Sequence, residues 1–361
     1  MKEHKFKYEW TLKDANFTKD KGKVFSCFAC GGGSTMGYKL AGFDVIGCNE
    51  IDPKMIEAYK TNHNPKYSYL EPIQTFKLRK DLPKELYDLD ILDGSPPCSS
   101  FSMAGNREKD WGKEKKFREG QANQVLDNLF FDFIDLAKEL QPKVVVAENV
   151  SGLMMGAAKE YVKKIYLAFK EAGYQLRIEP YLLDASTMGV PQRRRRVFFI
   201  ALRNDLANPF MEQVDMFQEA PKLDLKFNEK SIKYKELKTK DGTELKMSDL
   251  VKQYWELRKT SHKRMPDVLK DLGMKEQRFG DNYVLDDNTP MTLTSAGSYY
   301  REDEPTTISI TDLKKIGSFP LDYDFINNSS NNTKYIIGMS VPPIMTAQIS
   351  SRIYEQWLSK I

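Results

Sequence analysis

Short apolar runs, mostly of β-branched residues, recur along the N-terminal part of the chain, with helical spacing of apolar residues between them. The predicted strands are Lys23–Ala29, Asp44–Asn49, Leu89–Leu92, Val144–Ala147 and Val197–Leu202. Helical patterns are clearest at Gln124–Leu140 and Lys159–Ala172, and a further one ends near Leu40. Strands that alternate with helices in this way are typical of a parallel α/β sheet covered on both faces. Tyr174–Leu183, followed by Val197–Leu202, predicts a closing hairpin at the edge of that sheet.

The alternation stops after about Asn204. Residues 205–325 are rich in lysine and have few long apolar runs, which predicts a second, smaller domain. Residues 1–22 form a polar N-terminal extension. Tyr335–Ile361 regains an apolar helical pattern, so we expect this last segment to pack back on the first domain.

Composition excludes several classes of protein. With 361 residues, 40% hydrophobic and 12% aromatic, the chain can build a substantial core. It has neither a long apolar segment nor an apolar N-terminal signal, and four cysteines do not make a disulfide framework. We therefore expect a cytoplasmic protein without membrane contact.

Charge is distributed unevenly. The net charge is only +4, but residues 221–278 hold 16 Lys and Arg against 10 Asp and Glu. A locally basic module suits a nucleic-acid partner. A solvated helical surface rich in Lys and Glu would look the same, and on charge alone it is the stronger explanation.

A glycine-rich turn, Cys30-Gly31-Gly32-Gly33, lies between the first strand and a helix. Glycines let the backbone approach a ligand closely, and Glu50, at the end of the second strand, could accept hydrogen bonds from ribose hydroxyls. A tight turn needed only for packing is the alternative.

Cys27 and Cys30 also have CxxC spacing, but the chain has no second CxxC and only three scattered histidines. We therefore expect no metal site, and expect Cys27 to pack as a small hydrophobic residue.

Cys98 follows a pair of prolines just past the strand that ends at Leu92. Prolines fix the backbone there, at the edge where open α/β sheets place their active sites. A lone cysteine is more often structural, but this rigid frame and the polar loop that follows make Cys98 a candidate nucleophile.

Two further strand ends carry reactive groups. Glu148 comes directly after four apolar residues, so we expect it to be partly desolvated, with a raised pKa suited to proton transfer. The run Arg193–Arg196 leads into the strand Val197–Leu202, and its side chains should alternate between the two faces. A surface phosphate patch is the alternative to a role in the cleft.

Together these motifs resemble the DNA cytosine-5 methyltransferases of bacteria and phages. The matching segments, in the order and spacing of that family, are Pro96-Pro97-Cys98, Leu129–Asp132, Glu148-Asn149-Val150, Gln192-x-Arg194-x-Arg196, Phe319-Pro320-x-Asp322-Tyr323 and Gly338-x-Ser340-Val341-Pro342-Pro343. The resemblance runs from about Val24 to the C-terminus and is weak at about 205–285. It implies a Rossmann-like class I methyltransferase sheet with a smaller target recognition domain.

The resemblance also implies a mechanism. Cys98 would add to C6 of a flipped-out cytosine, and the activated ring would take a methyl group from S-adenosylmethionine at C5. Glu148 would grip N3 and the 4-amino group, Arg196 would contact O2, and Arg194 would support Arg196 or the loop. The polar segment Ser99–Gln121 would close over the base.

For the cofactor, the resemblance implies a pocket made by Phe28, Gly31, Gly32, Gly33, Glu50, Ile51, Ile73, Pro97, Leu129 and Ser340. The implied division is an extension at 1–22, a catalytic domain at 23–203, a target recognition domain at 204–325 and a returning segment at 326–361. Thr289–Thr294 resembles the end of the recognition domain. The implied partner is double-stranded DNA, bound by a monomer. Whether a cognate restriction endonuclease accompanies the enzyme is left open.

Some positions depart from the family pattern. Ser26 replaces the acidic residue that usually opens the glycine motif, and Cys30 replaces its first glycine. Pro72 stands where an aspartate is expected, with Glu71 beside it. The remaining departures are Ser99 for a glutamine and Met339 for an asparagine.

Two other readings compete with a DNA methyltransferase. A tRNA cytosine-5 methyltransferase would share the chemistry, although the Cys-Phe-Thr signature of that branch is absent. A catalytically inactive DNA-binding protein would leave the intact Cys98, Glu148 and Arg196 unexplained. An amino-methylating enzyme is disfavoured, because Ser95–Cys98 lacks the aromatic residue that follows the prolines in that class.

Overall fold

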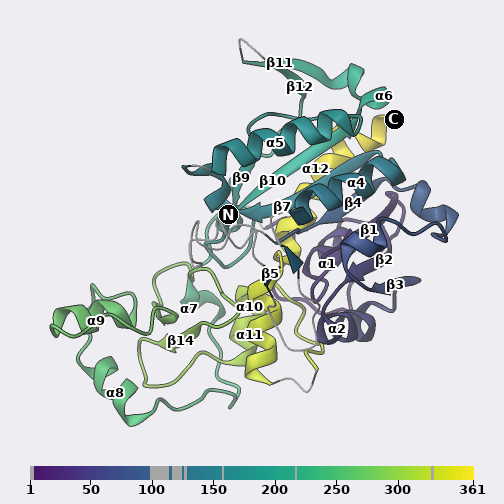
Figure 1. Ribbon diagram of the computed structural model, residues 1–361. Helices are drawn as coiled ribbons and strands as arrows, with labels where there is room; N and C mark the ends of the chain where they lie inside the picture. The colour runs from purple at the N-terminus through teal and green to yellow at the C-terminus, as the bar shows by residue number, and fades with distance from the viewer. Residues whose placement is uncertain are drawn as a thin grey trace. The chain divides into compact units, whose positions relative to one another are not determined.

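The computed structural model describes residues 4–97, 114–115, 124–125, 128–156, 158–215, 218–326 and 329–361 (Figure 1). The chain forms two compact units. The sheet unit consists of Asn16–Asp184, Arg195–Lys226 and Thr346–Ile361, and the second unit of Met1–Ala15, Ala185–Arg194 and Phe227–Met345. The predicted division into catalytic and target recognition domains concerns function, and it stays a prediction.

An eight-stranded sheet forms the centre of the sheet unit, in the order β3-β2-β1-β4-β7-β10-β8, with β9 also paired to β10. Its strands are β1 (Lys23–Cys27), β2 (Asp44–Glu50), β3 (Tyr67–Leu70), β4 (Ile91–Gly94), β7 (Val144–Val150), β8 (Tyr174–Gln175), β9 (Tyr181–Asp184) and β10 (Arg195–Arg203). Strands β1 to β4 and β7 are parallel, whereas β10 runs antiparallel to β7, β8 and β9. This topology confirms the predicted Rossmann-like α/β fold and its closing edge.

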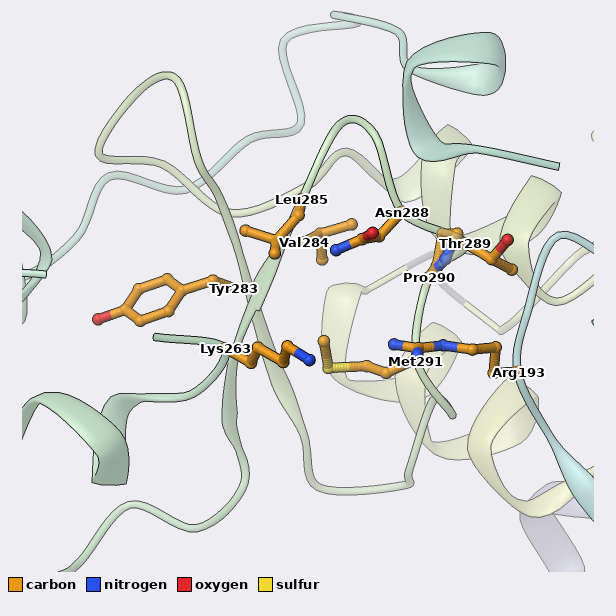
Figure 2. A pocket seen from close by; sticks show the side chains of 9 residues that line it. All are labelled: Arg193, Lys263, Tyr283, Val284, Leu285, Asn288, Thr289, Pro290 and Met291. Carbon is orange, nitrogen blue, oxygen red and sulfur yellow. The ribbon is translucent and has the colours of Figure 1, made fainter. Parts of the chain in front are cut away.

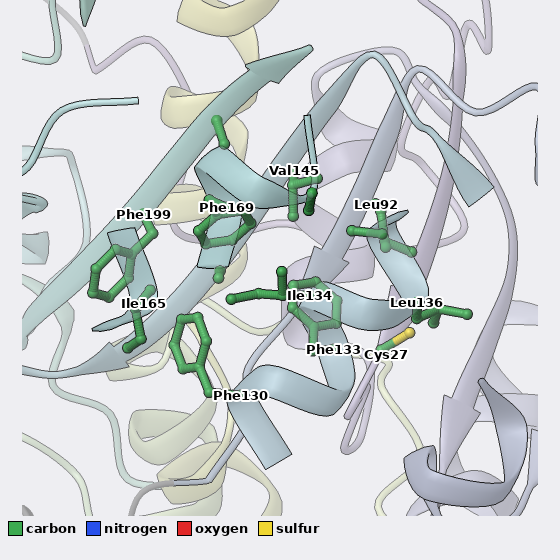
Figure 3. Close-up of a cluster of buried hydrophobic side chains, with 14 of the residues drawn as sticks. Cys27, Leu92, Phe130, Phe133, Ile134, Leu136, Val145, Ile165, Phe169 and Phe199 are labelled. Atoms are coloured by element: carbon green, nitrogen blue, oxygen red, sulfur yellow. The ribbon is translucent and has the colours of Figure 1, made fainter. Parts of the chain in front are cut away.

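Helices cover this sheet and bury its apolar side chains. They are α1 (Gly33–Leu40), α2 (Pro53–His63), α3 (Ile73–Phe76), α4 (Leu129–Leu140), α5 (Ala158–Glu171) and α12 (Pro343–Gln356), with short 3₁₀ turns η1 (Lys84–Tyr87) and η4 (Ser151–Met154). Figure 1 shows α4 and α5 in front of the sheet and α12 behind it. One hydrophobic core contains Phe130, Phe133 and Phe169 from α4 and α5 (Figure 3). It also contains Leu92 of β4, Val145 of β7 and Phe199 of β10. Burying this much apolar area supplies the main driving force for folding.

Cys27 and the start of α4 are two points at which this core meets the sequence predictions. Cys27 is 1% exposed within it, which confirms that it packs as a small hydrophobic residue. The predicted helix Gln124–Leu140 was too long at its N-terminus. Gln124–Val125 form a short strand, β6, paired with β5 (Glu114–Lys115), and α4 begins at Leu129, where the buried apolar stripe begins.

A small ribbon and the C-terminus complete the sheet unit. After β10 come α6 (Asn204–Ala207), η6 (Asn208–Phe210) and the antiparallel pair β11 (Met211–Asp215) and β12 (Gln218–Pro221). Trp357, just after α12 and before η7 (Leu358–Lys360), donates its indole N–H to the carbonyl of Lys222 at 2.7 Å. The Tyr354 ring packs edge-on against Phe43 at 6.2 Å. The end of the chain is thereby tied to the same unit as the sheet.

The second unit is built mainly of short elements. They are η5 (Ala185–Thr187), α7 (Tyr234–Leu237), α8 (Asp249–Glu256), α9 (Met265–Asp271), β13 (Asp281–Val284), β14 (Ser298–Arg301), α10 (Ile310–Ile316) and α11 (Ser330–Met339). Its N-terminal arm is held by side chains, because Trp10 donates to the Ser318 carbonyl at 3.0 Å and Asp322 accepts from the backbone of Leu12 at 2.7 Å. The guanidinium of Arg301 is fully buried and pairs with Glu244 and Asp312 at 3.1 and 3.2 Å.

The predicted C-terminal helix is two helices. Helix α11 ends at Met339 and α12 begins at Pro343. Pro342 and Pro343 explain the break, because a proline disfavours helical geometry in the residue before it and has no N–H to donate. None of the helices in the described part of the chain combines the length and the hydropathy needed to span a bilayer.

Candidate active site

The glycine turn follows β1 at the edge where the parallel strands end. Its backbone adopts left-handed conformations at Phe28 (φ 52°), Cys30 (φ 49°) and Gly32 (φ 81°). For side-chain-bearing residues such conformations cost on the order of 1–2 kcal/mol each, so the surrounding structure must hold them. A Cβ at Gly32 would lie 2.3 Å from the ring nitrogen Nε2 of His63, so only glycine fits there. The turn is therefore a specific, strained structure rather than a flexible linker.

Glu50 holds this turn from the end of β2. Its Oε2 accepts from the backbone N–H of Cys30 at 2.7 Å, and its Oε1 accepts from Ile51 and Asp52 at 2.8 and 2.9 Å. Burial raises the pKa of the Glu50 carboxyl, although these N–H groups act in the opposite direction. An ionised carboxylate offers about four acceptor positions, so one remains for a hydroxyl of a ligand.

The other residues predicted for the cofactor lie in different surroundings. Phe28 and Ile51 are partly exposed, and so is Pro97, which follows β4. Ile73 and Leu129 are core residues at 2% and 0% exposure. Ser340 belongs to the second unit, where its buried hydroxyl has no hydrogen-bond partner among the described residues. The glycine turn, Glu50 and Pro97 belong to the sheet unit and lie at or just past the ends of the neighbouring strands β1, β2 and β4.

Glu148 and Arg196 form an ion pair at the same edge of the sheet. Phe198 lies opposite Glu148 in the β7–β10 register, and Arg196 lies two residues from Phe198, so both charged side chains project from the same face. Arg196 Nε lies 2.9 Å from Glu148 Oε1, and the two side chains are 15% and 13% exposed. Burial lowers the pKa of Arg196, while Glu148 acts in the opposite direction. A carboxylate and a guanidinium held side by side can bind a planar ring that has both donors and acceptors along one edge.

The four consecutive arginines alternate as predicted. Arg193 and Arg195 are exposed, whereas Arg196 is mostly buried and Arg194 is 3% exposed. Arg194 lies in the second unit and donates to the backbone carbonyls of Leu293 and Gly338, each at 3.0 Å. Its guanidinium therefore fastens two distant segments of that unit together.

An Arg194→Met variant is expected to lose about 3 kcal/mol or more of unfolding free energy, because two buried carbonyls lose a charged donor. Arg194→Lys should lose less, since an ammonium can still reach one of the two carbonyls. Urea denaturation of both variants would measure the difference. An Arg194→Met protein as stable as the wild type would contradict this role.

The loop after β4 is tied to β7 by Asn149. Its side-chain amide donates to the Pro96 carbonyl at 3.0 Å, and its Oδ1 accepts from the N–H of Val150 at 2.8 Å. Cys98 and most of Ser99–Gln121 lie outside the described residues, so the structure describes the path only as far as Pro97. Asn149 belongs to a recognised motif, yet the sequence assigned it no role of its own. A polar residue in an otherwise apolar strand could have indicated that Asn149 has a structural role.

Asp93 is a second residue that the sequence reasoning missed. It lies in β4 directly opposite Ser26 of β1, and it is 4% exposed. Its Oδ2 accepts from the hydroxyls of Ser26 and Ser34, both at 2.7 Å, and its Oδ1 accepts from Tyr38 at 3.1 Å. An aspartate in a buried strand could have signalled a site, because buried acids need several partners.

A small pocket lies in the second unit (Figure 2). Arg193 and Lys263 supply positive charge to its wall, while Val284, Pro290 and Met291 make it apolar. Lys263 and the apolar lining residues belong to 204–325, the region predicted to read DNA, whereas Arg193 lies outside that range.

Comparisons with known proteins agree with one another. Residues 22–355 match the sequence profile of the family described as C-5 cytosine-specific DNA methylase. The Type II methyltransferase M.FnuDI of Fusobacterium nucleatum is 29% identical over 349 residues, which cover 94% of this chain and 96% of that protein. The Type II methyltransferase M.NgoPII of Neisseria gonorrhoeae is 26% identical over 356 residues, covering 92% and 95%.

Among solved structures, the chain is similar to a protein encoded within an E. coli prophage and assigned as a DNA modification methyltransferase. The TM-score is 0.61 at 19% identity, over 92% of this chain and 99% of that one. This likeness concerns the fold.

Proposed function

Because this chain belongs to the C-5 cytosine-specific DNA methylase family, we propose that it transfers a methyl group from S-adenosylmethionine to C5 of a cytosine flipped out of duplex DNA. The observation that carries the proposal is the Glu148–Arg196 pair, 2.9 Å apart beside the loop that leads to Cys98. Cytosine presents N3, O2 and a 4-amino group along one edge. A carboxyl group and a guanidinium side by side complement that edge.

In the proposed reaction Cys98 acts as the nucleophile. Its thiolate adds to C6 of the ring, while Glu148 protonates or hydrogen-bonds N3 and so draws electrons out of the ring. Arg196 contacts O2 and keeps the ring oriented. After C5 has taken the methyl group, the C5 proton passes to solvent, N3 returns to Glu148 any proton it received, and the Cys98–C6 bond breaks, which restores both the aromatic ring and the thiolate. Arg194 acts indirectly, through the segments that it fastens in the second unit.

The residues at the switch point of the sheet suit S-adenosylmethionine. Strand order reverses between β1 and β4, and open α/β sheets bind their ligands outside the strand ends at such a point. Gly31–Gly33 leave room for close backbone approach, and Glu50 keeps an acceptor position for a ribose hydroxyl. When bound, the cofactor supplies an electrophilic methyl group. Contacts from Phe28, Ile51, Ile73, Pro97, Leu129 and Ser340 remain predictions.

DNA recognition is proposed for residues 204–325. The basic surplus at 221–278 suits phosphate contacts, and Arg193 and Lys263 line a pocket in the second unit. Base-specific contacts would come from the same region, which the resemblance identifies as the target recognition domain.

The test is transfer of a labelled methyl group. The purified protein and labelled S-adenosylmethionine are incubated separately with unmethylated duplex DNA and with tRNA. Label in DNA at C5 of cytosine is the expected result. Label found only in tRNA would show that the substrate is tRNA and not DNA. Binding to DNA without any transfer of label would favour a catalytically inactive DNA-binding protein.

A further inference from the structure

We propose that Asp93 is the buried acid of the cofactor pocket, and that it replaces on β4 the acidic residue that Ser26 does not supply on β1. This inference rests on the proposed use of S-adenosylmethionine. Asp93 is a positioning residue for the glycine turn, and its negative charge favours a cationic ligand over a neutral one.

Strand register places Asp93 at the centre of a row of polar residues. Ser26 and Asp93 are direct partners in the β1–β4 pair, so their side chains project from the same face. Asp93 lies opposite Val146 in the β4–β7 pair, and Glu148, two residues further on, projects from that face as well. Arg196 completes the row through its pairing with Glu148. Phe25, Leu92 and Val145, on the opposite face, belong to the hydrophobic core.

The hydrogen bonds of Asp93 reach both ends of the glycine turn. Ser26 lies in β1, before the turn, whereas Ser34 and Tyr38 lie in α1, after it. All three hydroxyls donate to the Asp93 carboxylate. Asp93 in β4 can therefore hold the turn in place through hydrogen bonds to the residues on both sides of it. An acidic residue at position 26 of β1 would otherwise serve this purpose.

The location suits a charge that acts on a ligand. Asp93 lies at the β1–β4 switch point and is followed by Gly94 and the loop to Pro97. S-adenosylmethionine carries a positive sulfonium, which becomes a neutral thioether once the methyl group has left. The Asp93 carboxylate is buried and accepts from three neutral hydroxyls, so it gains most from a cation that arrives with the ligand. We therefore expect Asp93 to favour the cofactor over its demethylated product.

The charge state of Asp93 should be visible in the pH dependence of binding. Burial raises the pKa of Asp93 to about 6, with a further upward contribution from Glu148, and the three hydroxyls act against it. Among the residues that the structure describes, the titratable or charged groups that act on it are Tyr38 on α1, Cys27 on β1, Glu148 on β7 and, through Glu148, Arg196 on β10. Asp93 is thus ionised at pH 7.5 and protonated below about pH 6. Affinity for S-adenosylmethionine should fall as the pH falls through that value.

The experiment measures binding of S-adenosylmethionine and S-adenosylhomocysteine by calorimetry, without DNA, to the wild type, Asp93→Asn and the double variant Ser26→Asp/Asp93→Ser. Asp93→Asn should weaken S-adenosylmethionine binding about tenfold or more, and more than it weakens binding of the product. The double variant, which moves the acid back to β1, should recover most of the lost affinity. Asp90→Asn is the matched control, because Asp90 precedes the same strand and pairs with Lys143 at the opposite end.

The proposal would be overturned if Asp93→Asn bound S-adenosylmethionine within twofold of the wild-type affinity. It would also be overturned if Asp93→Asn lost affinity equally for both ligands and the double variant recovered none of it. If Asp93→Asn does not fold, the wild-type pH profile and the double variant decide in its place. A wild-type protein that binds neither ligand would instead overturn the proposed cofactor, which separates failure of that proposal from failure of this inference.

Discussion

A Cys98→Ser variant is expected to leave DNA unmethylated. The thiolate is the nucleophile in the proposed reaction, and a serine hydroxyl is too weakly acidic to replace it without an adjacent base. Without the bond to C6 the ring does not become nucleophilic at C5, so transfer should be lost rather than slowed. Bisulfite sequencing of DNA from cells that express the variant would measure this, and it would also reveal the target sequence in cells that express the wild type.

Cys48→Ala is the matched control for that variant. Cys48 lies fully buried in β2, where burial raises the pKa of its thiol, so it has no means to act as a thiolate. Its removal should leave methylation in place. Modified cytosines at the wild-type level in the Cys98→Ser strain would eliminate Cys98 as the nucleophile.

Glu148→Gln is expected to lower the rate of methyl transfer by about 10²- to 10⁴-fold, the usual contribution of a general acid or base. Glutamine keeps the size of the side chain and a carbonyl that can accept from Arg196 Nε, now at 2.9 Å from the glutamate. The fold should therefore survive, although the neutral partner weakens the ion pair. Single-turnover kinetics with saturating cofactor and DNA would measure the chemical step.

The control for that variant is Glu139→Gln, an exposed position near the end of α4 whose carboxylate contacts Lys80 at 3.3 Å. It should react at the wild-type rate. A Glu148→Gln enzyme that is folded and fully active would show that Glu148 neither holds nor transfers the proton at N3. A variant that fails to fold would be replaced by Glu148→Asp, which keeps the acid and shortens its reach.

Local patterns in the sequence determined much of this protein. Apolar runs at Val144–Ala147 and Val197–Leu202 predicted the strands β7 and β10, because strands covered on both faces of a sheet read as nearly continuous apolar runs. The order of the motifs identified the family, and the alternation along Arg193–Arg196 predicted that about half of these arginines point inward. These features depend on neighbours in the chain, so one sequence is sufficient to read them.

Only the tertiary structure decided which residues act together across strands. Ser26 and Asp93 are 67 positions apart, and their hydrogen bond depends on the register of β1 and β4. The same holds for Asn149, whose amide reaches the Pro96 carbonyl from another strand. Ser26 looked like the loss of an acid when read alone, whereas the sheet places an acid directly beside it. The pairing of β1 with β4 joins segments that are far apart in the sequence, so the pattern of either strand alone does not show which of their residues meet.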